Sequence, residues 1–209
     1  SHEYQTVTEA GEDIIYVCGK CRVAINKEIA GEQAVCLQCG NKDLKKNKSI
    51  EVGNIFSLKT KFSEPFDLNF IDENGQENLI LMGCYGIGVG RLMGTIVEIS
   101  NDANGIIWPE AVAPYRVHLI DLKGKTGKSS QLAENIYDKM TKNGVEVLFD
   151  DRDDVRAGEK FADADLLGIP YRVIVSDKTA ERDSAEIKKR DGAKSEVLPV
   201  GDIIKKISK

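Results

Sequence analysis

The segment NLILMGCYGIGVGRLMGTIVEIS, residues 78–100, sets the architecture of the first half of this 209-residue chain. It starts with an apolar run that predicts a strand, and residues 91–100 carry apolar side chains at the spacing of a buried helix. Upstream, residues 66–71 alternate in polarity, and Asn74-Gly75 offers the turn of a hairpin. Two further stretches predict strands, residues 14–17 and 50–58, and the lysine-rich residues 42–48 before the second are expected to form a loop. We therefore expect an antiparallel sheet closed by a helix.

Four glycines line the end of this strand and the turn into the helix: Gly83, Gly86, Gly88 and Gly90. Their missing side chains let a ligand approach the backbone closely. Arg91 follows them and is the only Lys or Arg between Lys61 and Arg116, so its guanidinium could bind a phosphate oxygen there. The alternative is that the glycines serve tight packing and Arg91 is a surface charge. Cys84, in the same run, is more typical of a small buried side chain than of a nucleophile.

Four of the five cysteines form two Cys-x2-Cys pairs separated by fourteen residues: Cys18, Cys21, Cys36 and Cys39. Two thiolates on one tight turn can both face a metal ion, and two such turns, called knuckles below, complete a tetrahedral zinc site. Four protein ligands leave no open position for chemistry, so a structural Zn²⁺ is expected. Two disulfides or four unrelated thiols are the alternatives.

The second half of the chain alternates strands with helices. Three stretches predict strands, residues 115–122, 145–150 and 171–176, and two segments between them predict helices, residues 129–142 and 158–167. A short hairpin and a closing helix follow, which gives an α/β domain with a mainly parallel sheet. Because residues 105–114 contain two prolines and no periodicity, we place a linker there and the domains at 1–113 and 114–209.

Composition and charge exclude several classes of protein. With 41% hydrophobic and 30% charged residues, the chain is globular. Its net charge is −5. Residues 1–113 contain 10 Lys and Arg against 16 Asp and Glu, and residues 114–209 contain 19 Lys and Arg against 18 Asp and Glu. This acidity argues against indiscriminate nucleic-acid binding, although a local basic patch can still hold an RNA backbone. We find no bilayer-spanning segment and no signal peptide, so a cytoplasmic protein is expected.

Residues 124–130, GKTGKSS, imitate the end of a nucleotide-binding loop. Wrapping the phosphates requires Gly-x4-Gly-Lys-Ser/Thr, and the first glycine of that pattern would fall at Leu122. Gly124 comes two residues too late. We therefore expect a solvated basic loop and no phosphate-binding NTPase site.

Four longer runs together resemble bacterial-type prolyl-tRNA synthetases: EVGNIFSLKTKFSEPF (51–66), MGCYGIGVGRLM (82–93), NGIIWPEAVAPYRVHLI (104–120) and FDDRDDVRAGEKFADADLLGIPYRVIV (149–175). The resemblance covers essentially the whole chain, in order. GIGVGR is similar to motif 3 of class II aminoacyl-tRNA synthetases, and residues 115–209 resemble the anticodon-binding domain of the family. The resemblance implies a homodimeric ligase that attaches proline to its tRNA with ATP and Mg²⁺.

The same resemblance implies roles for single residues. Arg91, with Gly88 and Gly90, would bind the ATP phosphates, and Arg91 would act catalytically by stabilising charge on the leaving pyrophosphate. A proline pocket is implied for seven residues: His2, Glu3, Thr60, Phe62, Ser63, Cys84 and Gly86. Two departures affect this pocket, because Asn54 stands where the family usually has His and Lys59 where it usually has Gly. For His2 the alternative is a remnant of a purification tag.

Unpaired anticodon bases can be read by hydrogen bonds and by stacking on aromatic or guanidinium planes. Such groups are present after the strand that ends at Asp150, at the edge where open α/β sheets bind ligands. The resemblance points to five RNA contacts there: Arg152 and Lys160 first, then Arg156, Phe161 and Asp150. A solvated acidic loop with internal ion pairs is the alternative.

Two expected features of the family are missing from the sequence. Only residues 22–35 separate the cysteine pairs, where many bacterial relatives carry an editing domain that hydrolyses alanine wrongly attached to the tRNA. Nothing in the chain resembles motifs 1 and 2, so we expect the C-terminal part of a synthetase, inactive by itself. The alternative function is a zinc-ribbon or anticodon-domain RNA-binding accessory protein without catalysis.

Overall fold

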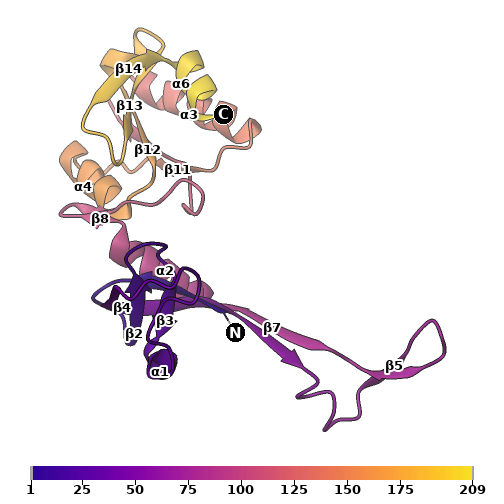
Figure 1. Cartoon of the computed structure of the whole chain (residues 1–209). Helices are drawn as coiled ribbons and strands as arrows, with labels where there is room; N and C mark the ends of the chain where they lie inside the picture. Colours follow the sequence, from indigo (N-terminus) through magenta and orange to yellow (C-terminus); the bar gives the residue numbers. More distant parts are fainter. Residues whose placement is uncertain (1, 209) are drawn as a thin grey trace. The chain divides into compact units, whose positions relative to one another are not determined.

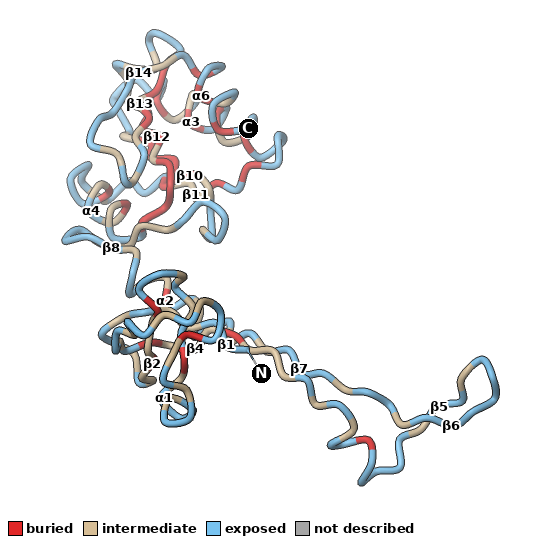
Figure 2. The backbone as a smooth tube through the Cα atoms, viewed as in Figure 1, coloured by how far each residue is buried: buried red, intermediate tan, exposed pale blue. Residues whose placement is uncertain are grey.

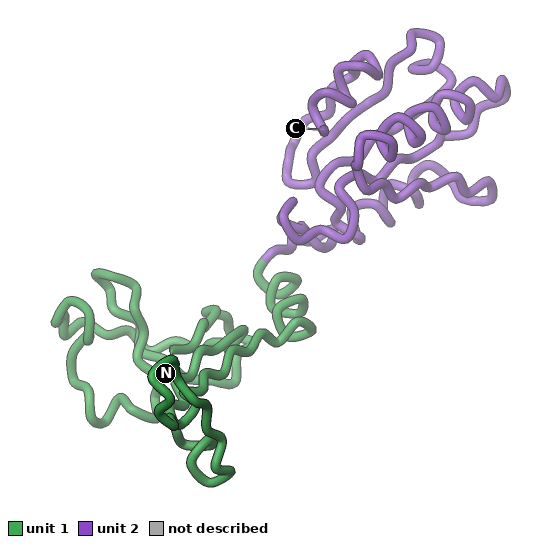
Figure 3. The backbone as a smooth tube through the Cα atoms, turned by 90° about the vertical axis from the view of Figure 1, so that its right-hand side faces the viewer, with its two compact units in different colours: residues 1–99 green, residues 100–209 purple. Residues whose placement is uncertain are grey.

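The computed structural model describes residues 2–208, which form two compact units divided between Ile99 and Ser100, called units 1 and 2 below (Figure 3). The segment in which the sequence predicts a linker belongs to unit 2. Trp108 donates its backbone N–H to the carbonyl of Gly168 at 3.1 Å and its indole N–H to the carbonyl of Leu167 at 3.1 Å. Just before this segment, Asp102 accepts two hydrogen bonds from Arg190 at 2.7 and 2.8 Å. No helix among the described residues is long and apolar enough to cross a membrane.

Unit 1 is built on a five-stranded antiparallel sheet: β1 (His2–Val7), β2 (Asp13–Cys18), β3 (Ala24–Asn26), β4 (Leu44–Lys59) and β7 (Met82–Ile87) (Figure 1). The long strand β4 is central, because β1, β2 and β7 all pair with it. The lysine-rich stretch before residue 50, expected as a loop, is the first part of this strand. A short helix, α1 (Lys27–Ala30), follows β3.

Gly11 lies where the chain passes from β1 to β2. Both strands reach Ser49 of β4, as the pairs Val7–Ser49 and Asp13–Ser49. A Cβ at Gly11 would overlap the backbone atoms of Ser49. Only glycine allows the connection to lie this close to the strand, so β1 and β2 can both pair with β4.

The hairpin and the helix of unit 1 form as predicted, but with more exposure than expected. The hairpin pairs β5 (Asn69–Ile71) with β6 (Glu77–Leu79), and Gly75 at its tip has φ +78°. The helix is α2 (Val89–Ile99), in which Thr95 is the only described residue that is buried. Val89 is 77% exposed and Met93 56%. The prediction of a buried helix is therefore wrong, because Leu92, Ile96 and Val97 are only half-buried and the other apolar side chains of α2 are exposed.

Unit 2 confirms the predicted α/β domain. Its sheet contains β10 (Val117–Leu122), β11 (Val147–Asp150), β12 (Tyr171–Ser176), β13 (Ser184–Lys189) and β14 (Ser195–Pro199), in the order β11-β10-β12-β13-β14. The first three are parallel and the last two antiparallel. The helices are α3 (Lys128–Lys142), α4 (Ala157–Leu167), α5 (Asp177–Ala180) and α6 (Val200–Ile207), and a small ribbon pairs β8 (Asn101–Asp102) with β9 (Gly105–Ile106).

The core of unit 2 follows the alternation of its strands, and Figure 2 shows buried segments along its sheet. Alternate residues of three strands pack against α3 and α6, among them Val117, Leu119, Val147, Tyr171, Val173 and Val175. On the opposite face, Ile120 and Ile174 pack against Ala164 of α4. Strand β11 lies at the edge of the sheet, and the face of β11 on the side of α4 is only partly covered.

The GKTGKSS loop binds an internal carboxylate. The backbone N–H groups of Thr126 and Ser129 donate to Asp177 at 3.2 and 3.3 Å, and hydrogen bonds from Thr126 and Ser129 lower the pKa of Asp177. A Cβ at Gly124 would overlap this carboxylate. The loop therefore anchors α5 to the start of α3.

Candidate functional site

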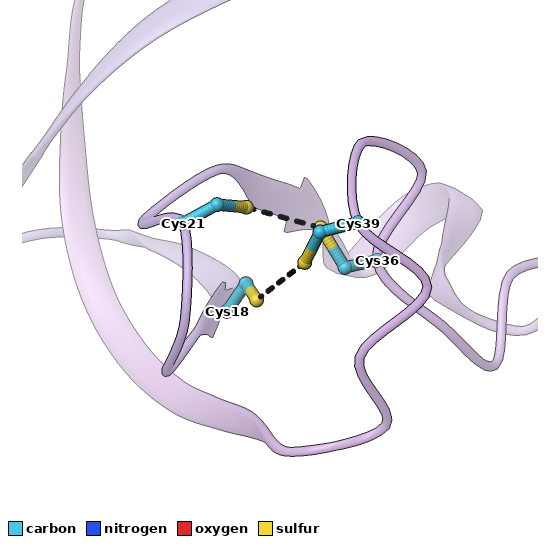
Figure 4. A group of neighbouring side chains, drawn as sticks. All are labelled: Cys18, Cys21, Cys36 and Cys39. Carbon is cyan, nitrogen blue, oxygen red and sulfur yellow. Dashed lines mark hydrogen bonds between the residues drawn. The ribbon is translucent and has the colours of Figure 1, made fainter.

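The two knuckles have the same backbone construction. In each, the N–H four residues after the first cysteine donates to that cysteine's carbonyl, from Arg22 to Cys18 at 3.1 Å and from Gly40 to Cys36 at 2.8 Å. Both donors are left-handed, with φ +64° at Arg22 and +69° at Gly40. This repeated turn directs both cysteines of each pair toward the other knuckle (Figure 4).

The four thiols form one group. The sulfur atoms of Cys18 and Cys39 are 3.6 Å apart, those of Cys21 and Cys36 are 3.4 Å apart, and all four lie within 4.8 Å of one another. Zn–S bonds of about 2.3 Å in a tetrahedron give sulfur separations of about 3.8 Å, whereas a disulfide needs about 2.05 Å. All four thiols are free. The arrangement therefore fits a metal ion and not two disulfides.

The electrostatics of the group favour uneven proton loss. Hydrogen bonds from the backbone N–H of Cys21 and the side chain of Asn41 lower the pKa of Cys18 to about 6. At Cys21 the backbone N–H of Val23 acts to lower the pKa, but Cys36 and burial outweigh it and raise the pKa to about 12. Four sulfurs at this distance cannot all be thiolates without a cation between them.

Strand register sorts the predicted proline-pocket residues by face. Glu3 pairs with Asn54, which pairs with Gly86, and Cys84 lies two residues before Gly86 on the same face. The adjacent row, which contains His2, lies on the opposite face because neighbouring residues of a strand alternate. Cys84 is exposed, contrary to the expectation of a small buried side chain.

The remaining pocket candidates lie in the turn after β4, beyond the last pair of the β4–β7 ladder, Lys59–Met82. Ser63 is buried and donates its hydroxyl to the carbonyl of Thr60 at 3.2 Å, so it holds the turn. Phe62 is 41% exposed, and the Nζ of Lys61 lies 5.4 Å from its ring centroid.

Arg91 lies at the start of α2, where the glycine-rich strand turns into the helix. Its Nη1 donates to the backbone carbonyl of Glu51 in β4 at 2.8 Å, and its side chain passes close to Gly88. Gly90 has open space beside its Cα. The guanidinium is thus positioned over the sheet by one backbone contact and keeps further donors.

A cleft of about 310 Å³ lies beside the edge strand of unit 2. Its walls include Leu148 of β11 and Leu166 of α4, and its polar lining includes His118, Asp150, Arg152 and Asp163. His118 is buried, its pKa is lowered by burial, and its Nδ1 has no hydrogen-bond partner among the described residues. Four of the lining residues, His118, Leu148, Asp163 and Leu166, are not predicted from the sequence, because a strand or helix pattern does not tell which residues line an uncovered edge.

Arg152 lines this cleft just after the carboxyl end of strand β11. It binds Asp150 through two side-chain hydrogen bonds of 2.9 and 2.8 Å and Asp163 through a third of 2.8 Å. The bidentate bond from Arg152 lowers the pKa of Asp150 to about 2, and both carboxylates raise the pKa of Arg152. The loop after β11 is therefore fixed in place by a charged network.

The other anticodon candidates differ in exposure. Lys160 is 2% exposed, and its Nζ donates to the carbonyl of Asp121 at 2.8 Å and lies 3.5 Å from the Asp150 carboxylate. The predicted direct contact from Lys160 to RNA is thus not possible in this structure, because its ammonium is enclosed. Arg156 is exposed just before α4, and Phe161 packs under the guanidinium of Arg172 at 5.2 Å.

Comparison with known proteins agrees with the division of the chain into units 1 and 2. The family model of the tRNA synthetase class II core domain (G, H, P, S and T) matches residues 12–100, and that of the anticodon binding domain matches residues 116–209. The proline–tRNA ligase of Persephonella marina is 47% identical over 83% of this chain. Those of Heliobacterium modesticaldum and Bacillus pumilus are 44% and 46% identical over 85% and 75% of it.

The homologues of this chain are prolyl-tRNA synthetases. The chain spans about 30% of the length of these curated relatives, from 27% to 30%. The fold agrees as well. A crystal structure of prolyl-tRNA synthetase from Cryptosporidium parvum, complexed with L-proline and AMP, superposes with a TM-score of 0.66 at 21% identity, covering 79% of this chain and 38% of that one.

Proposed function

We propose that the chain contributes part of a cytoplasmic, homodimeric proline–tRNA ligase, in which unit 2 reads the anticodon of proline tRNA and unit 1 forms one wall of the adenylate site. The observation that carries this proposal is the cleft beside β11, in the unit that matches the anticodon binding domain. Its leucine walls suit a flat base, and its carboxylates and imidazole suit hydrogen bonds to base edges.

Within this proposal the charged residues of unit 2 have different tasks. Arg152, which borders the cleft, contacts the base, and buried Asp150 holds its guanidinium in place. Exposed Arg156 binds a phosphate. Lys160 is a positioning residue, because its ammonium holds Asp150 from below. Phe161 supports Arg172 and is not itself a stacking platform.

Unit 1 would act through Arg91, Gly88 and Gly90 on the phosphates of ATP. ATP with Mg²⁺ supplies the leaving pyrophosphate when the proline carboxylate attacks the α-phosphorus. The donors of Arg91 that Glu51 leaves free would stabilise the charge that develops there. Glu3, Cys84 and Gly86 share one face and would border the proline, with Asn54 beside them and the turn of Thr60, Phe62 and Ser63 at the end of the ladder. His2 faces away from this group.

The cysteine group would hold a structural Zn²⁺. Its four sulfurs fit a closed tetrahedral site, and the short connection between the knuckles leaves no room for an editing domain at that point. We propose that residues 1–209 alone do not aminoacylate, because one wall cannot enclose the substrates.

The test is binding of the full chain to a proline tRNA transcript and to the same transcript with altered anticodon bases. We expect at least about tenfold weaker binding after the alteration, and loss of this difference in Arg152→Ala. Exposed Arg182, which makes no ion pair among the described residues, provides the matched control Arg182→Ala. Equal binding of both transcripts to the unaltered chain would reject anticodon reading.

The accessory-protein alternative is separated by complementation with the rest of a synthetase. Under the ligase proposal, adding the synthetase segment that contains motifs 1 and 2 to the chain restores proline attachment, and Arg91→Ala removes it again. An accessory protein without catalytic ancestry gives no attachment with or without Arg91.

A further inference from the structure

The basic residues of unit 1 are concentrated around the knuckles. Residues 20–48 contain seven Lys and Arg against three Asp and Glu, a net of 7 − 3 = +4. The rest of unit 1, residues 1–19 and 49–99, contains three against eleven, a net of 3 − 11 = −8. The seven cations are Lys20, Arg22, Lys27, Lys42, Lys45, Lys46 and Lys48, and we call them the basic knuckle surface.

Backbone contacts bring these residues together around the thiols. Gly19, beside Lys20, donates its N–H to the carbonyl of Asp43 at 3.1 Å, which places the first knuckle against the segment that contains Lys42. Lys45 pairs with Val17 of β2, immediately before Cys18. All seven side chains belong to exposed residues. Lys20, Lys42 and Lys45 therefore lie beside the cysteine group, and Lys46 and Lys48 follow along β4.

Most of these cations have no partner within the protein. Lys48 makes a loose ion pair with Glu9 at 3.9 Å, and the other six make no ion pair and no side-chain hydrogen bond among the described residues. Unit 2 pairs Arg152, Arg172 and Arg190 with carboxylates at 2.7 to 2.9 Å, although it also has exposed lysines without ion pairs among the described residues. Charge that is not neutralised internally is available to an anionic partner.

A metal ion in the cysteine group does not consume this excess. Four thiolates and one Zn²⁺ carry a net charge of −2, so the net of +4 from side chains would still leave about +2 around the site. Protection of a strand edge is a competing explanation for part of the surface, because residues 44–47 pair with β2 and have no described strand on their other edge. It does not account for Lys20, Arg22 and Lys42, which lie outside the strands.

We infer that the basic knuckle surface binds the phosphate backbone of tRNA. The inference takes from the proposed function only that the partner is tRNA. The surface offers point charges and no aromatic residue, so it holds the backbone without reading sequence. The basic knuckle surface therefore strengthens the binding of any tRNA, whereas selectivity for the anticodon comes from unit 2.

The experiment uses the full chain, the two transcripts named above and a titration of salt. The variant is Lys42→Gln/Lys45→Gln/Lys46→Gln, and the matched control is Lys139→Gln/Lys142→Gln/Lys194→Gln, which removes the same charge from exposed lysines of unit 2 that are free of ion pairs among the described residues. We expect about 10-fold to 100-fold weaker binding of both transcripts by the knuckle variant, and a slope of log affinity against log salt that is smaller by about 2. The control stays within about threefold of the unaltered chain.

The outcomes separate this inference from anticodon reading. If the unaltered chain does not distinguish the transcripts but the knuckle variant still loses affinity and salt dependence, the inference holds and the proposed function fails. If the knuckle variant binds like the control, the inference is overturned. Unchanged tRNA affinity together with self-association of the variant would also overturn it, and would assign the lysines to protection of the β4 edge.

Discussion

Unit 2 closes an apolar core with its own residues, whereas unit 1 does not. The buried apolar residues described in unit 1 are Ile15, Cys18, Ile25 and Cys36, and two of these belong to the thiol group. Unit 2 buries a continuous set on both faces of its sheet. The comparison teaches that apolar packing holds unit 2 together, while unit 1 depends on the long ladder of β4 and on its knuckles.

The largest effect is expected from breaking the thiol group. Cys36→Ser removes one ligand, and structural zinc sites contribute about 10–16 kcal/mol, as much as the stability of a whole domain. Hydrogen exchange of the full chain should show lost protection in the knuckles and β2, and unchanged protection in β10 and β12. Exposed Cys84→Ser is the control and should change neither unit. Retained protection of β2 in Cys36→Ser would show that unit 1 does not need the group.

A matched pair of truncations should sharpen the contrast in packing. Ile136 is 1% exposed in α3, so Ile136→Ala should destabilise unit 2 by about 2–5 kcal/mol. Ile87 is 72% exposed in β7, so Ile87→Ala should change stability by less than about 0.5 kcal/mol. Urea unfolding followed by circular dichroism measures both. Similar losses in the two variants would mean that the apolar side of β7 is covered in solution.

A smaller, pH-dependent effect is expected at Asp150. Its pKa is lowered to about 2 in the folded protein, chiefly by Arg152, from an ordinary value of 3.8. A lowered folded pKa stabilises the protein above pH 4, and this stabilisation disappears as the pH falls from about 4 to 2. Asp150→Asn should therefore cost unit 2 about 1–2 kcal/mol at pH 7 and little at pH 2. A constant difference across this range would contradict the charged network.

The two units also differ in how far their sequences predict them. In unit 2, the alternation of strand and helix patterns predicts elements close to the observed ones, because each element is buried by the same chain. In unit 1 the same rule predicts a buried α2 and a lysine-rich loop. It fails there because periodicity tells which side of an element is apolar, and not whether anything covers that side.

The candidate sites show the same limit. The spacing of the cysteines was sufficient to predict the thiol group, since a knuckle is a local structure. Whether Glu3 shares a face with Cys84 and Gly86 depends on the pairing of β1 and β7 with β4, which are far apart in the sequence. The burial of Lys160 depends on Asp121 and Asp150, which come from two other strands. Such facts require the three-dimensional arrangement.

The most direct test of the account compares anticodon discrimination by the full chain before and after removal of metal with a chelator. Because unit 2 is held by its own core, we predict that the ratio of affinities for the two proline tRNA transcripts stays the same, while both affinities fall as the knuckles lose their structure. Loss of the ratio on metal removal would contradict the account, since anticodon reading would then depend on unit 1.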